Sequence, residues 1–190
     1  MSFLGLKVPH ETARLLSELD VPGRKEPVGN FHVTILHLGD NVPIEELAKA
    51  LIATYEVSSK TPPFSVSTNK LSCFPAKPDA EVPLICHVDS DELHDLRDRL
   101  CASYDAAGIQ YSKKFPEYLP HLTLGWGKEQ VADQRIPTVE WGAHELVLWG
   151  GDDGDRRVVI TFPFSLKVAS MPRRVLARYV GKSSLQDSPP

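Results

Sequence analysis

The feature that most constrains this chain is a tetrapeptide pattern that occurs twice. The segments His32–Ile35 and His121–Leu124 both read histidine, apolar residue, threonine, apolar residue, and both lie in apolar, β-rich runs. On a β-strand, residues i and i+2 project from the same face. Each segment therefore predicts a strand that presents an imidazole and a hydroxyl on one face and anchors its apolar residues on the other.

The composition argues against a coincidental repetition of this pattern. The chain has 190 residues, of which 7 are histidine and 42% are hydrophobic. At this composition the pattern is expected about 0.05 times per chain. Two occurrences therefore indicate a paired site rather than two unrelated polar positions.

The hydrophobic periodicity along the chain predicts alternating strands and helices. Strands are expected over residues 3–8, 31–38, 64–74, 84–88, 121–126, 145–149 and 158–164, and the last two should form a hairpin. Helices are expected over 13–19 and 44–55, and from the capping pair Asp89 and Glu92 to Gly108. Because the strand and helix pattern begins again after residue 63, the chain should contain two similar lobes.

The length predicts a single domain built from these lobes, residues 1–170. Residues 171–190 form a tail that is basic and then rich in serine and proline, which we expect to be partly disordered and to which we assign no function. No apolar run approaches the roughly 20 residues of a membrane span. We therefore expect a cytoplasmic protein without a membrane partner.

The charge and the cysteines exclude further classes. The formal net charge of −4 argues against a surface that holds a long nucleic acid through counterion release. The 3 cysteines have no C-x-x-C spacing, which indicates reduced thiols, and no cluster of histidine and cysteine has the spacing of zinc ligands. We expect no metal site and no cofactor.

The paired motifs, the second introduced by proline in Pro120–Leu124, resemble those of the two-histidine (2H), LigT-like phosphoesterase superfamily. The resemblance covers roughly residues 1–170 in element order. It implies a bilobal α+β fold in which two antiparallel sheets, related by a pseudo-twofold axis, face a central cleft with the helices outside. It also implies that each lobe supplies one motif to the cleft.

The residue types suit acid–base chemistry on a phosphodiester next to a ribose 2′-oxygen. Imidazole titrates near ~6.5, so one histidine can serve as a base while the other, protonated, serves as an acid. We expect His32 and His121 to fill these roles without a metal ion. Thr34 and Thr123 would donate hydrogen bonds to the non-bridging oxygens as charge develops there. The sequence leaves open which histidine is the acid.

Five further residues are candidates for substrate contacts. Phe74 follows a predicted strand, and Phe115 and Tyr118 precede the second motif, where aromatic rings could stack on nucleobases. Resemblance to phage nucleases of the superfamily adds Glu145 and Trp149, which share one face of a predicted strand.

The other five histidines are assigned no role: His10, His37, His87, His94 and His144. Regular strand alternation places the side chain of His37 on the face opposite that of His32, so we interpret His37 as structural.

The resemblance to compact phage members, the anti-CBASS type, favours a small cyclic nucleotide or cyclic oligonucleotide signal as the substrate, in the host cytoplasm for a phage-encoded enzyme. One alternative is RNA end processing, either opening of a 2′,3′-cyclic phosphate or 2′-5′ ligation. Another is a nucleotide-binding module that kept the cleft without catalysis. Base preference and oligomeric state are not set by the sequence.

Overall fold

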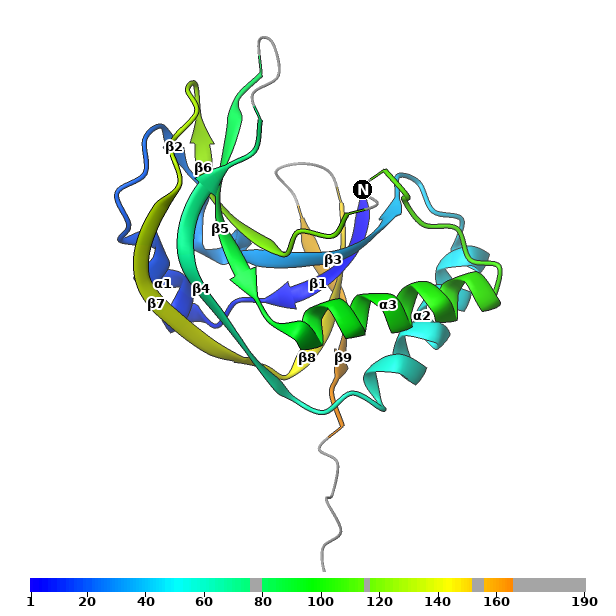
Figure 1. Cartoon of the computed structure of the whole chain (residues 1–190). Helices are drawn as coiled ribbons and strands as arrows, with labels where there is room; N and C mark the ends of the chain where they lie inside the picture. Colours follow the sequence, from blue (N-terminus) through cyan, green and yellow to red (C-terminus); the bar gives the residue numbers. More distant parts are fainter. Residues whose placement is uncertain (76–79, 115–116, 152–155, 166–190) are drawn as a thin grey trace, which may run out of the picture.

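The computed structural model describes residues 1–75, 80–114, 117–151 and 156–165. In this part of the chain, nine strands form one antiparallel sheet accompanied by three α-helices and a 3-10 turn (Figure 1). The α+β class predicted from the sequence is confirmed. None of the described helices is long and apolar enough to cross a membrane.

The elements have the following bounds. The strands are β1 (Ser2–Lys7), β2 (Arg24–Lys25), β3 (His32–Gly39), β4 (Phe64–Cys73), β5 (Val82–Asp89), β6 (His121–Gly127), β7 (Gln134–Ala143), β8 (Glu145–Gly150) and β9 (Arg157–Pro163). The helices are α1 (His10–Ser17), η1 (Val28–Asn30), α2 (Ile44–Ser58) and α3 (Asp91–Ala106).

The sheet has two halves that meet at its centre. The strand order is β7-β4-β5-β6-β3-β1-β8-β9, with β2 added beside β6. The halves join where Val33 of β3 pairs with Leu122 of β6, and this short pairing makes one continuous sheet of the two that were expected. Because the join is short while the pairings within each half are long, each half can curve separately from the other.

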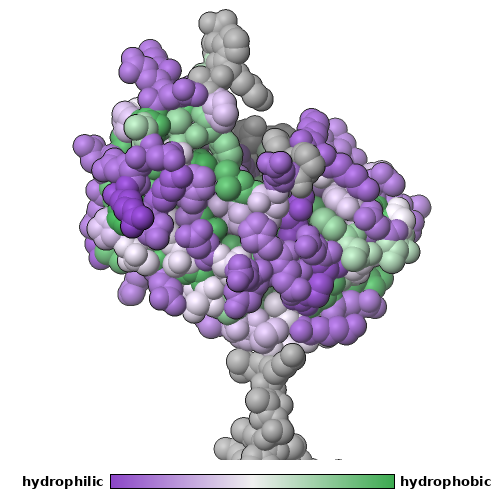
Figure 2. Space-filling view, viewed as in Figure 1, coloured by the Kyte–Doolittle hydropathy of each residue, from purple (hydrophilic) through white to green (hydrophobic). Residues whose placement is uncertain are grey.

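Helix α3 buries the apolar stripe predicted from its sequence. Leu93, Leu96, Leu100 and Tyr104 are fully buried, and the Tyr104 hydroxyl lies 2.7 Å from Thr54 Oγ1 of α2, which packs beside α3 (Figure 1). The outward side of α3 belongs to a mostly hydrophilic face (Figure 2). The helix begins at Asp91, after Ser90 as its N-cap, and not at the predicted Asp89 and Glu92 pair.

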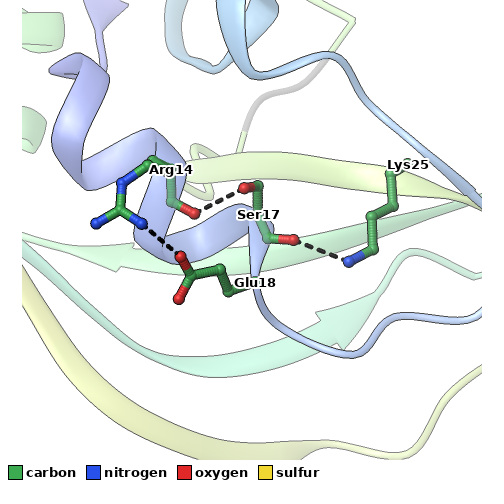
Figure 3. A network of polar contacts seen from close by, with 4 residues as sticks. All are labelled: Arg14, Ser17, Glu18 and Lys25. Atoms are coloured by element: carbon green, nitrogen blue, oxygen red, sulfur yellow. Dashed lines mark hydrogen bonds and ion pairs between the residues drawn. The ribbon is translucent and has the colours of Figure 1, made fainter.

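Strand β2 is short, but it ties α1 to the centre of the sheet. Lys25 Nζ donates to the carbonyl of Ser17 at 2.8 Å at the end of α1 (Figure 3). It also donates to the carbonyl of Leu19 at 2.9 Å, so it satisfies two acceptors at and just after the C-terminus of α1. In the same network Arg14 contacts Glu18 at 2.7 Å. Strand β2 was not predicted, because two exposed charged residues carry no strand pattern.

Strand β7 was also not predicted. It lies at the edge of the sheet beside β4, and its exposed, polar first half contains Pro137. Proline cannot donate to a central ladder but is tolerated at an edge, where one side of the strand has no partner. A sequence that alternates poorly and contains proline therefore still forms a strand in this place.

A β-bulge interrupts β3 at the last residue of its motif. Gly5 of β1 pairs with Thr34, whereas Leu4 pairs with Leu36, so Ile35 is an extra residue without a partner in β1. An extra residue reverses the alternation of side chains beyond it. Residues that follow Leu36 therefore change faces relative to a regular strand.

The second motif contains a bulge at the equivalent place. Ile85 of β5 pairs with Thr123 of β6, whereas Leu84 pairs with Gly125, so Leu124 is the extra residue. The two halves therefore repeat both the motif and the irregularity at its last residue, as expected for a pseudo-twofold relation.

Gly5 makes the close approach of β1 to the first motif possible. A Cβ atom on Gly5 would lie 2.5 Å from the backbone oxygen of Val33, which cannot move without displacing β3. We predict that Gly5→Ala lowers the free energy of unfolding by about 2 kcal/mol, a value typical of overpacking. Urea unfolding would measure this change.

The matched control is Gly29→Ala, because a Cβ atom at Gly29 would meet nothing within 4 Å. Equal effects of the two substitutions would contradict the account of the packing between β1 and β3.

Candidate active site

The two motifs begin the two central strands and face each other across the join. His32–Ile35 opens β3 and His121–Leu124 opens β6, and the paired residues Val33 and Leu122 are those between histidine and threonine in each motif. Because the strands are antiparallel, the residues next to this pair also face each other: His32 lies opposite Thr123, and Thr34 lies opposite His121. A local twofold axis through the pair thus relates the motifs.

Backbone carbonyls set the same tautomer in both histidines. His32 Nδ1 lies 2.6 Å from the carbonyl oxygen of Asn30, and His121 Nδ1 lies 2.7 Å from that of Leu119. A carbonyl only accepts, so Nδ1 must carry the proton and donate it. In the neutral rings Nε2 is therefore the unprotonated nitrogen that can take a proton from a substrate.

Partial burial lowers the pKa of both motif histidines below the ordinary value of 6.5. For His32, the hydrogen bond to Asn30 and the charge of Glu26 raise the pKa, and the charges of Arg156 and His121 lower it further. For His121, the hydrogen bond to Leu119 raises the pKa and nearby His87 lowers it. Both rings are therefore predominantly neutral at pH 7 until an anion approaches and favours protonation of one.

Each motif histidine contacts an aromatic side chain from its own half of the sheet. His32 lies 4.8 Å from Phe3 and 5.5 Å from Trp149, measured between ring centroids, and Phe3 and Trp149 stack on each other at 5.2 Å. In the other half, Phe74 meets His121 edge to face at 4.7 Å. Aromatic surfaces therefore flank both sides of the histidine pair.

A cavity of about 670 Å³ opens beside His121. One wall is apolar and includes Phe74, Pro83 and Trp126, and hydrophobic side chains gather beside the hollow at the top of Figure 2. The cavity also reaches Thr34, whereas His32 and Thr123 are not among its lining residues. It is therefore placed to hold the part of a ligand that extends from the His121 side.

Tyr118 closes one side of this cavity and connects the two halves. Its hydroxyl donates to the backbone oxygen of Thr34 at 3.1 Å, and Arg97 lies 4.9 Å from its ring centroid. Burial raises the pKa of Tyr118, so its hydroxyl keeps its proton and remains a donor.

The other three residues predicted to contact a substrate are Trp149, Glu145 and Phe115. Trp149 contacts His32, as described, whereas Glu145 pairs with Pro163 at the far end of β8 and does not line the cavity. Phe115 lies outside the described residues.

The prediction that His37 faces away from the motif is wrong. The bulge at Ile35 returns His37 to the face of His32, and its ring lies 5.9 Å from that of Phe3 and lines the cavity. The sequence contains a signal for this irregularity, since the apolar doublet of Ile35 and Leu36 breaks strict alternation.

Trp126 was not among the predicted site residues. It lies five residues after His121, as His37 lies five residues after His32. Its indole Nε1 donates to Glu26 Oε2 at 2.9 Å, and the Arg24 guanidinium lies 6.0 Å from its ring centroid. These contacts from the β2 segment hold the ring at the cavity wall.

Among residues 1–75, 80–114, 117–151 and 156–165, no group of three or more histidine, cysteine, aspartate or glutamate side chains is arranged to hold a metal ion.

The fold and the paired motifs define a two-histidine phosphoesterase. The sequence matches the model of the 2'-5' RNA ligase superfamily over residues 10–155, and the chain belongs to this superfamily. The family supports a phosphoesterase activity in general. No curated protein matches the chain.

Crystal structures of several other proteins share the fold. That of TT0787 of Thermus thermophilus has a TM-score of 0.72 and 20% identity, covering 86% of this chain and 97% of that one. A phosphoesterase structure has a TM-score of 0.65 and 19% identity, covering 86% and 98%. E. coli LigT complexed with 3'-AMP has a TM-score of 0.64 and 18% identity, covering 86% and 97%. At these identities the likeness establishes the fold alone.

The geometry around Nδ1 predicts the state of both motif histidines in solution. We expect His32 and His121 of the free protein to titrate below pH 6.5 and to be Nδ1-protonated when neutral, because burial disfavours the charged ring and carbonyls accept from Nδ1. Long-range proton–nitrogen NMR spectra over a pH series would report both properties. Titration above pH 6.5, or protonation at Nε2, would contradict the structure.

The same shifts predict how stability depends on pH. A histidine whose pKa is lower in the folded than in the unfolded protein favours folding above the unfolded pKa, and this contribution is lost as pH falls toward the folded pKa. The free energy of unfolding should therefore decrease as pH falls below about 6.5. Replacing both motif histidines by glutamine should weaken this dependence in urea titrations at several pH values.

Proposed function

We propose that this protein is a phosphodiesterase that cleaves a phosphodiester next to a ribose 2′-oxygen in a small cyclic nucleotide or cyclic oligonucleotide. The observation that carries the proposal is the cross-strand arrangement of the motifs, in which two histidines with the same tautomer meet across a local twofold axis. A binding module needs no such pair of titrating groups, whereas proton transfer at two oxygens does.

The reaction would use one proton acceptor and one proton donor. Nε2 of one histidine accepts the proton of the attacking 2′-hydroxyl or water, and Nε2 of the other, protonated, histidine donates its proton to the leaving ribose oxygen. Thr34 and Thr123 donate hydrogen bonds to the non-bridging oxygens, whose charge increases in the transition state. One bond to phosphorus forms and one breaks, and the pair of histidines ends with the proton positions exchanged.

Three observations support a small nucleotide as the substrate. The cavity of about 670 Å³ is within the range of small-molecule sites and has the aromatic wall that a nucleobase requires. The net charge of −4 disfavours long nucleic acids. A structural neighbour, E. coli LigT, was crystallised with 3'-AMP and with ATP.

The free thiols of the 3 cysteines agree with the further proposal of a cytoplasmic location.

The second candidate function, the runner-up to the first proposal, is RNA end processing, either by opening of a 2′,3′-cyclic phosphate or by 2′-5′ ligation. The observation that favours it is the match to a family model described by RNA ligation. The same four motif residues would serve, since a cyclic phosphate end presents the same bonds to them.

We predict that His32→Ala and His121→Ala each lower the turnover rate by about a thousandfold, the size expected for loss of a general acid or base. Thr34→Val and Thr123→Val should lower the turnover rate by about a hundredfold to a thousandfold, because each removes one hydrogen bond to the developing charge. The measurement is product analysis by liquid chromatography, with cyclic dinucleotides, cyclic trinucleotides and cyclic-phosphate-ended RNA as substrates, in the presence of EDTA.

The matched control is His10→Ala, which removes an exposed histidine of α1. Turnover confined to the RNA end would replace the first proposal with the runner-up. Activity that disappears in EDTA and returns with zinc would contradict the two-histidine mechanism. Ligand binding by wild type without turnover of any substrate would favour the non-catalytic module.

A further inference from the structure

The two halves of the site share the motif but differ in the residues around it. His37 and Trp126 occupy equivalent places after the two bulges, and Phe3 and Pro83 are the residues that pair with them on β1 and β5. One half thus carries an imidazole over a phenyl ring, and the other carries an indole beside a proline. Acid–base chemistry by two motif histidines does not require this difference.

A second basic side chain joins His37 on its side of the site. Arg156 precedes β9, and its guanidinium lies 6.0 Å from the centroid of Phe3. The rings of His37 and His32 lie 5.9 and 4.8 Å from the same Phe3 ring. Phe3 is 2% exposed and is stacked on Trp149, so it fixes the positions of the groups arranged around it.

The charges on this side act on one another. Burial lowers the pKa of His37, the charges of His121 and Arg156 lower it further, and Asp40 raises it. Arg156 also adds to the effect of burial in lowering the pKa of His32. A phosphate placed among these groups would offset their repulsion and would accept charge-assisted hydrogen bonds, which are stronger than neutral ones.

We propose that His37 and Arg156 form a second anion subsite, which binds a phosphate adjacent to the scissile one. This inference rests on the function proposed above and narrows its substrate class. The substrate is then a nucleotide with two neighbouring phosphates, as in a cyclic or linear oligonucleotide, and not a mononucleoside cyclic phosphate alone.

The apolar half supplies the complementary place for a nucleobase. Trp126 is held by its hydrogen bond to Glu26, and Phe74 and Pro83 lie on the same wall of the cavity. An aromatic wall binds a base without regard to phosphate charge. The substrate would therefore lie across the histidine pair, with a base on the β6 side and the second phosphate on the β1 side.

The test compares two substrates that differ by one phosphate, adenosine 2′,3′-cyclic phosphate with and without a 5′-phosphate. For wild type we expect kcat/KM to be at least about tenfold higher with the 5′-phosphate, mainly through KM. His37→Gln removes the titrating ring and Arg156→Gln removes the charged guanidinium, so each should bring this ratio close to one.

Two control variants show whether the loss of the 5′-phosphate preference is specific to His37 and Arg156 or follows from removal of any nearby arginine or exposed histidine. Arg157→Gln changes the exposed neighbour of Arg156, and His10→Gln changes an exposed histidine of α1, so both should keep the wild-type ratio. Thermal unfolding of each variant shows whether it folds, and a variant that does not is replaced by His37→Asn or Arg156→Lys, with Arg156→Lys expected to keep part of the preference.

The outcomes distinguish the two proposals. A wild-type ratio near one, or a ratio that survives both glutamine substitutions, would overturn the anion subsite while leaving the phosphodiesterase proposal in place. Absence of turnover of both substrates and of the cyclic dinucleotides would overturn both proposals.

Discussion

The pairing of Val33 with Leu122 is the contact on which the site depends, because it brings β3 and β6 together at the centre of the sheet. Both side chains are fully buried, and each is worth about 1.5–3 kcal/mol relative to exposure, so the join is fixed by the core and not by the site. The motif residues on either side of this pair then face the opposite surface, each histidine across from the other motif's threonine. The position of the reacting groups is thus a consequence of packing behind them.

The two bulges are equivalent, and each turns one further side chain toward the site; the site is asymmetric because these side chains differ, His37 in one half and Trp126 in the other. Gly5 allows β1 to approach β3 closely beside the first bulge, and the change of alternation turns His37 toward the cavity. The equivalent change in β6 turns Trp126 to the same cavity. The two equivalent motifs are thereby combined with walls of different polarity, and under the proposed function this difference would give a substrate a preferred direction across the histidine pair.

Much of this arrangement could be predicted from the sequence, because same-face geometry follows from spacing alone in the His32 and His121 motifs. The strands and helices with a clear hydrophobic periodicity were also predicted, because that periodicity follows directly from the spacing of apolar residues. The bulge that redirects His37 was missed because regular alternation was assumed, although the apolar doublet of Ile35 and Leu36 breaks that alternation. Strand β7 was missed because its polar, proline-containing sequence suits the edge of a sheet and lacks the alternation of a typical strand. The role of Trp126 was missed because the contacts that hold its ring come from β2, which was also not predicted.

The central claim is that His32 and His121 divide the roles of acid and base. The most direct test uses a phosphodiester whose leaving oxygen is replaced by sulfur, because a thiolate leaves without being protonated. We predict that this substrate restores activity to one of the two variants, His32→Ala or His121→Ala, and leaves the other inactive. The restored variant identifies the acid. Restoration of both variants, or of neither, would contradict a division of roles between the two histidines.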